Sequence, residues 1–302
     1  MFAIFAKFIP FTLLIILLSF NSLANTELKK LSFSVLKTAE SSGSLEAMVV
    51  AGGDFFTVRQ LVHTAVLVRH PKGDFLWDSG IGREVEQQMQ DFNFLEKQLF
   101  SIENINPAAQ QLLDGGYSLD SLMAIIPSHM HWDHASGIED FASVPVWIQK
   151  HSLEEAREGM PPGFLQSQYD SGDIIWRLIE LNAVAYKGFD KSLDIFGDNS
   201  AVLVDLSGHT HGQLGLFLNN IGEGESYFFI GDTTWALKGV IDNMPRPGVV
   251  EWFVGVDTDF EQNSSVIAKI HALKLEDPTL HIVPAHDELV LETMPVYPNF
   301  KE

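Results

Sequence analysis

Short apolar runs bounded by turn residues recur along this chain and predict β-strands. They occupy residues 61–68, 75–77, 122–126, 144–148, 201–206, 214–218, 227–230 and 280–283. Between them, apolar positions at helical spacing predict helices over residues 83–99, 107–113, 152–158 and 264–274. Pro107 suits a first helical turn and Ser152 is a candidate cap. Because strands and helices alternate, the pattern predicts an α/β fold.

The first 24 residues have a different pattern. Lys7 precedes an apolar run from Phe8 to Phe20, and Ser22-Leu23-Ala24 places small residues three and one positions before a possible cut. This pattern predicts a signal peptide over 1–24 and a periplasmic or secreted protein. An uncleaved anchor is the alternative, although the run is short for a span of about 20 residues. Because no later segment is apolar enough to cross a membrane, we expect no stable anchor after cleavage.

Composition narrows the possibilities for residues 25–302. The chain has 302 residues, 46% of them hydrophobic, and no internal repeat or linker, so we expect one domain with one large core. The absence of cysteine excludes disulfides and thiolate metal ligands. The net charge of −21 opposes the phosphate backbone of nucleic acids. A small neutral or cationic substrate fits this charge better.

Polar residues repeatedly follow the predicted strands. His129, His209, Asp232 and His286 each come shortly after an apolar run. Loops at strand ends are where rigid scaffolds carry function. We therefore expect these residues to carry function.

A dense group of candidate metal ligands lies in one hexapeptide. His129, His131, Asp133 and His134 fall within six residues. Alternate residues of an extended segment share a face, so His129 and His131 can bind one ion while Asp133 and His134 reach toward a second. Imidazole and carboxylate suit zinc and similar divalent ions.

The motif His129-x-His131-x-Asp133-His134 resembles the signature of the metallo-β-lactamase superfamily. Later elements match in the order of that family, from about residue 61 to residue 287: an early Asp78-Ser79-Gly80 turn, Gly208-His209-Thr210, Gly231-Asp232 and Pro284-Ala285-His286-Asp287. Asp78 is expected either to support the site or to cap its own turn.

The resemblance implies an αββα sandwich of two mixed sheets flanked by helices, with the site at one edge. It also implies two divalent metals, with zinc expected. One metal is assigned to His129, His131 and His209. The other is assigned to ligands from two parts of the chain, with a carboxylate bridging the metals: Asp133, His134 and His286, with Asp232 as the bridge.

The resemblance further implies hydrolysis of a small ester or lactone. In this hypothesis a metal-bridging hydroxide attacks the carbonyl carbon, and Asp133 relays a proton to the leaving group. The bridging Asp232 and the stretch 70–80 look like those of N-acyl-homoserine lactonases. β-Lactamase and phosphotriesterase activities remain alternatives, as does a mono-iron redox enzyme.

One position departs from the lactonase pattern. Those enzymes usually place a tyrosine three residues after the bridging aspartate, where this chain has Trp235. An indole N–H can donate a hydrogen bond but cannot exchange a proton in the same way. Trp235 is expected either to form an apolar wall of the pocket or to belong to the core, and His211 either lines the pocket or is a solvated loop residue. The remaining histidines match no motif and are expected to be structural or surface residues: His63, His70, His151, His271 and His281.

Overall fold

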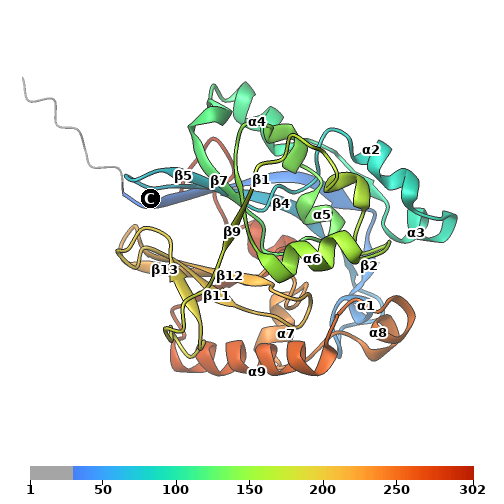
Figure 1. The fold of residues 1–302 in the computed structure, drawn as a ribbon. Coiled ribbons are helices and arrows are strands. Elements are labelled where there is room, and N and C mark those ends of the chain that lie inside the picture. The colour runs from blue at the N-terminus through green and yellow to red at the C-terminus, as the bar shows by residue number, and fades with distance from the viewer. Residues whose placement is uncertain (1–29) are drawn as a thin grey trace, which may run out of the picture.

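The computed structural model describes residues 30–302, and two mixed sheets face each other with helices on their outer sides (Figure 1). This arrangement confirms the predicted αββα sandwich. The predicted signal peptide lies outside the described residues. Within residues 30–302, no helix has the length and apolar character needed to cross a membrane.

The larger sheet has seven strands, with parallel and antiparallel neighbours. In spatial order they are β6 (Ile102–Glu103), β1 (Ser32–Ser41), β4 (Val62–Arg69), β5 (Asp74–Trp77), β7 (Leu122–Ile126), β8 (Val146–Gln149) and β9 (Trp176–Ile179). The pairs from β1 to β5 are antiparallel, and those from β5 to β9 are parallel.

The second sheet has five strands and completes the sandwich. They are β10 (Ser192–Asp194), β11 (Ala201–Asp205), β12 (Leu214–Ile221), β13 (Glu225–Phe229) and β14 (His281–Val283), of which only the β13–β14 pair is parallel. A small separate ribbon pairs β2 (Ser44–Leu45) with β3 (Val58–Arg59).

Strand β4 shows how the sequence builds the layers. Side chains alternate between the faces of a strand. Val66 packs into the core between the sheets, whereas Ala65 and Leu67 pack into the layer on the outer side. Because both faces are covered, β4 is continuously apolar over residues 65–68, as expected for a strand segment buried on both sides.

Helices cover the two outer faces of the sandwich. The helices of the described chain are α1 (Glu46–Val49), α2 (Val85–Gln88), α3 (Phe94–Leu99), α4 (Ala108–Asp114), α5 (Trp132–Ala135), α6 (Lys150–Glu158), α7 (Leu237–Ile241), α8 (Gly248–Val254), α9 (Phe260–Glu276) and α10 (Glu288–Leu291). Leu112 of α4 and Leu153 of α6 pack on the larger sheet. Ile270 of α9 packs on the smaller sheet, and Figure 1 shows α9 along that side.

The structure corrects two helix predictions. Residues 83–99 do not form one amphipathic helix, because they divide into α2, a 3-10 turn at Met89–Asp91 and α3. Asn93 starts α3 with a capping box to Glu96, which interrupts the longer helix. Ser152 is not a cap either: α6 already begins at Lys150, and Ser152 lies buried within it. The long strand β1 has no counterpart among the predicted strands.

Candidate metal centre

The structure brings all seven predicted ligands to one edge of the sandwich, mostly beyond the carboxyl ends of strands. His129 and His131 lie in the loop after β7, and helix α5 carries Asp133 and His134. The remaining three follow strands β11, β13 and β14: His209, Asp232 and His286. That these residues hold metals stays a prediction. Their geometry divides them into two clusters, one for each predicted metal.

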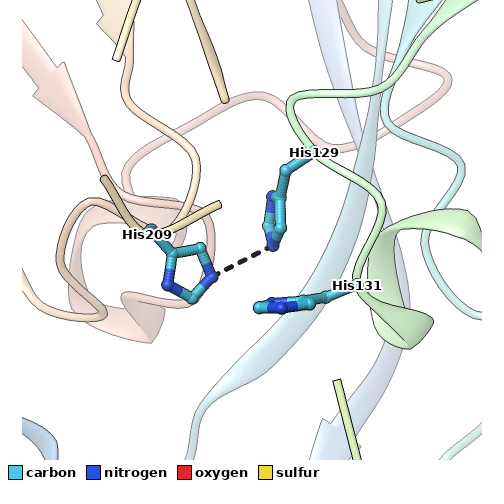
Figure 2. Close-up of side chains that lie close together, drawn as sticks. All are labelled: His129, His131 and His209. Atoms are coloured by element: carbon cyan, nitrogen blue, oxygen red, sulfur yellow. Dashed lines mark hydrogen bonds between the residues drawn. The ribbon is translucent and has the colours of Figure 1, made fainter. Parts of the chain in front are cut away.

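Three imidazoles form the first cluster (Figure 2). His129 and His131 come from one loop and His209 from another, and each offers a nitrogen within 4.8 Å of those of the others. The Nε2 atoms of His129 and His209 are 3.2 Å apart. This set is the one that the resemblance assigns to the first metal.

The second cluster joins α5 to the loops after β13 and β14. His134 Nε2 lies 3.3 Å from His286 Nε2, and Asp232 Oδ1 lies 3.2 Å and 3.0 Å from these two nitrogens. Asp133 Oδ2 is 3.3 Å from His286 Nε2. His129, His134 and Asp232 also offer donor atoms within 4.8 Å of one another. Asp232 therefore lies between the two clusters.

Hydrogen bonds at the outer ring nitrogens determine which nitrogen faces inward as an acceptor. His286 Nδ1 lies 2.8 Å from the Val62 carbonyl oxygen, which can only accept, so this nitrogen carries the proton. His209 and His134 direct Nδ1 at carboxylates in the same way. When these three rings are neutral, their Nε2 atoms carry lone pairs that can bind a metal. The Nε2 pairs His129–His209 at 3.2 Å and His134–His286 at 3.3 Å are close enough for each pair to bind one cation.

The charges of the site also fit cations. Burial lowers the pKa of His129 and His131 well below the ordinary value, which keeps these imidazoles neutral. Burial opposes ionisation of Asp232, but His286 and His134 outweigh burial and lower its pKa well below the ordinary value. The neighbouring carboxylates outweigh burial and raise the pKa of His134 and His286, so without a metal these two rings hold protons that a bound divalent ion would displace. Asp232 Oδ1 is also buried without a hydrogen-bond partner.

Asp78 occupies the supporting position that the resemblance implies. Its carboxylate accepts the Ser128 backbone N–H at 2.6 Å and lies 3.0 Å from His134 Nδ1. It therefore holds both the loop that leads into the motif and the ring of His134.

A second supporting carboxylate, Asp257, was not found from the sequence. Its Oδ1 lies 2.9 Å from His209 Nδ1 and accepts from the buried Arg246 at 2.7 Å. The turn that presents His209 packs on α9, where a Cβ at Gly208 would lie 2.5 Å from the backbone nitrogen of Asn263. Only glycine fits that approach. No local motif marks Asp257, because it lies three residues before the start of α9 and joins the site only in the fold.

His63 was expected to be an ordinary structural residue, but it lies beside the centre. Its Nδ1 is 3.1 Å from Asp133 Oδ2, and its ring centroid is 5.1 Å from that of His286. Burial lowers the pKa of His63 below the ordinary value, although Asp133 opposes this effect. Its position within an apolar strand gave no signal of this contact.

A cavity of about 740 Å³ opens onto the centre. One part of its lining is apolar and includes Leu61, Leu99, Phe100 and Phe164. Three glutamates line the part formed by α6: Glu154, Glu155 and Glu158. No lysine or arginine among residues 30–302 contributes to the lining. Beyond the predicted metal ligands the cavity is therefore apolar on one side and acidic on another.

Trp235 and His211 both line this cavity. Trp235 Nε1 donates to Asp232 Oδ2 at 2.9 Å, and the Trp235 ring packs against Arg246. The indole N–H therefore donates its hydrogen bond to the predicted bridging carboxylate and not into the cavity. His211 keeps 61% of its side chain exposed and contacts Glu155 at 3.0 Å.

The sequence model of the metallo-beta-lactamase superfamily matches residues 58–280. An N-acyl homoserine lactonase of Bacillus thuringiensis is 25% identical over 237 residues, or 78% of this chain and 84% of the relative. A gamma-lactamase of Fusarium pseudograminearum is 26% identical over 166 residues, or 52% of this chain. The chain spans 39% of that relative and 56% of a gamma-lactamase of Gibberella moniliformis.

Solved structures share the fold. An N-acyl homoserine lactone hydrolase with N-hexanoyl-L-homoserine at its catalytic metal centre gives a TM-score of 0.65 at 20% identity, covering 90% of this chain and 99% of its own. A dizinc quorum-quenching lactonase gives 0.57 at 15% identity, covering 91% and 90%. The family model over residues 58–280 shows that the chain belongs to the metallo-β-lactamase superfamily, within which it is similar to N-acyl homoserine lactonases.

Proposed function

We propose that this protein is an exported binuclear hydrolase that opens a neutral lactone. The observation that carries the proposal is the two pairs of Nε2 atoms, His129–His209 at 3.2 Å and His134–His286 at 3.3 Å, with Asp232 between them. Two divalent cations would satisfy both pairs at once. The dizinc relative supports zinc, which suits imidazole and carboxylate ligands.

Lactone hydrolysis requires a new bond from water oxygen to the carbonyl carbon and cleavage of the ring C–O bond. A proton passes from the water to the departing alkoxide, which gives a hydroxy acid. Two divalent ions at such a site, when bound, polarise the carbonyl and lower the pKa of a shared water to around 7. Asp133 lines the cavity beside His286 and is the carboxylate that we assign to carry the proton. Trp235 does not serve this step, because its N–H is held by Asp232.

The charge of the cavity supports a neutral substrate. β-Lactam antibiotics carry a carboxylate, and enzymes commonly bind carboxylates through arginine or lysine. The described lining has neither residue and adds three glutamates. A lactone enters uncharged, and its apolar substituent can pack near Leu99 and Phe100. The anionic product would then be repelled by the acidic wall.

Two further activities are less well supported. A mono-iron enzyme would need only the first cluster, whereas here Asp133, His134 and His286 form a second group of donors. A phosphotriester is also uncharged and is therefore equally compatible with the charge of the cavity, but the sequence relatives that cover most of both chains include N-acyl homoserine lactonases. Export rests on the N-terminal pattern alone, which supports a periplasmic or secreted location.

A substrate panel tests this function. The purified, metal-loaded protein would be assayed with an acyl-homoserine lactone, a simple γ-lactone, a cephalosporin and an aryl phosphotriester. We expect turnover of a lactone, little or no turnover of the cephalosporin, and loss of activity in Asp133→Ala. Preferential hydrolysis of the cephalosporin, or no lactone hydrolysis by fully metal-loaded protein, would overturn the proposal.

A further inference from the structure

We propose that His63 is a positioning residue: its Nδ1–H donates to Asp133 and holds that carboxylate against the second metal. This inference rests on the proposed function, which places a metal beside Asp133. It gives a role to a buried imidazole that matches no part of the family motif.

The contact is a product of the tertiary fold. His63 lies on β4 and Asp133 on α5, yet His63 Nδ1 and Asp133 Oδ2 are 3.1 Å apart. His63 points to the same outer face of the sheet as Ala65, the face against which Ala135 of α5 packs. Both side chains also line the cavity. A donor from the rigid sheet therefore fixes a carboxylate on a helix of only four residues.

The geometry favours a hydrogen-bonding role over metal ligation by His63. Donor atoms of His63, Asp133 and His286 lie within 4.8 Å of one another, a spacing that an ion could also bridge. However, His134, His286, Asp133 and Asp232 already offer four donors, the usual number for zinc. Carboxylates that bind metals are commonly oriented by hydrogen bonds, and losing such a partner weakens metal binding by about 10–100-fold.

The role of His63 can be tested with variants that either keep or remove a hydrogen-bond donor at the position of Nδ1. Asparagine places its amide N–H close to the position of the histidine Nδ1, whereas leucine has similar size and no donor. In His63→Asn and His63→Leu we would measure, by competition with a chelator, the affinity for each of the two zinc ions. The matched control is His70→Leu, because His70 is equally buried at 7% exposure and contacts Asp198 at 3.2 Å, remote from the centre.

We expect His63→Leu to weaken binding of the second zinc by about 10–100-fold. His63→Asn should weaken it by less than about threefold, a change below 1 kcal/mol, and His70→Leu should leave it unchanged. Equal loss in His63→Asn and His63→Leu would overturn the inference in favour of direct ligation by the imidazole. Unchanged affinity for the second zinc in both variants would also overturn the inference, because the contact between His63 and Asp133 would then have no effect on metal binding.

A replacement variant and an assay without substrate keep this test independent of misfolding and of the proposed function. If His63→Leu fails to fold, His63→Gln replaces it, because the glutamine amide reaches the Nε2 position instead of the Nδ1 position. The measurement uses zinc without any lactone. Lack of lactone turnover by a protein that binds two zinc ions would therefore overturn the proposed function and leave the role of His63 standing.

Discussion

Asp257 joins the metal centre to a buried charge, because its Oδ1 lies 2.9 Å from His209 Nδ1 and 2.7 Å from Arg246 Nη1. Arg246 is among the most buried large side chains described. A second Arg246 nitrogen donates to the backbone oxygen of Asp232. One buried ion pair therefore supports a predicted ligand of the first metal and the turn that carries the predicted bridge.

Asp257→Asn should weaken binding of the first metal by about 10–100-fold, because the neutral amide no longer raises the basicity of His209. The unpaired charge of Arg246 should also destabilise the metal-free protein by about 3 kcal/mol or more. Chelator competition and urea unfolding measure the two effects. Asp259→Asn is the control, since Asp259 lies in the same loop and only caps α9. Equal effects of the two variants would contradict this account.

Trp235→Phe separates a role at Asp232 from a role at the substrate. The variant keeps an aromatic wall but loses the N–H that donates to Asp232 Oδ2 at 2.9 Å. Hydrogen bonds to charged groups contribute about 1.5–3 kcal/mol. We expect the free energy of unfolding to fall by about that amount while KM for the lactone changes little. A large rise in KM at unchanged stability would place the indole N–H on the substrate instead.

Charge reversal in the cavity tests the basis of substrate selection. Glu158→Lys should raise kcat/KM for an anionic cephalosporin by about fivefold, since one charge interaction in water is worth about 1 kcal/mol. The gain should shrink in 1 M salt, where screening acts over about 3 Å. Glu276→Lys, at the far end of α9, matches the change in net charge. The same gain in Glu276→Lys would refute a local effect of the cavity wall.

Glu155 should impose a pH dependence on stability. Burial raises its pKa above 4.5, although hydrogen bonds from Thr258 and His211 oppose the shift. The folded protein then binds this proton more tightly than the unfolded chain, so stability falls as pH rises from 4.5 through the folded pKa. In Glu155→Gln this part of the slope should disappear. Melting temperatures from pH 4 to 8 measure it, and parallel curves for the two proteins would contradict the assignment.

The fold could be predicted largely because its strands are buried. The predicted strands agree with the observed ones to within three residues at either end, since an apolar run such as 122–126 has few alternatives. The helix over 83–99 was wrong because apolar spacing does not register the cap at Asn93. Strand β1 mixes polar and apolar residues, and its pattern gave no clear signal.

Some residues of the site could be predicted from the sequence and others could not. The seven predicted ligands lie in local motifs, so the sequence was enough to name them and the structure brings them together. His63 and Asp257 carry no motif, because their contacts with Asp133 and His209 join segments that meet only in the folded chain. Supporting residues of this kind require coordinates.

Metal content is the most direct test of the central claim. The purified protein would be loaded with excess zinc, passed through a desalting column and measured by elemental analysis beside Asp232→Ala and His281→Ala. His281 is exposed and lies outside the predicted centre, so its variant is the control. We expect two zinc ions per chain for the parent and the control, and fewer than two for Asp232→Ala. One ion or none in the parent, or two ions in Asp232→Ala, would contradict a binuclear centre bridged by Asp232.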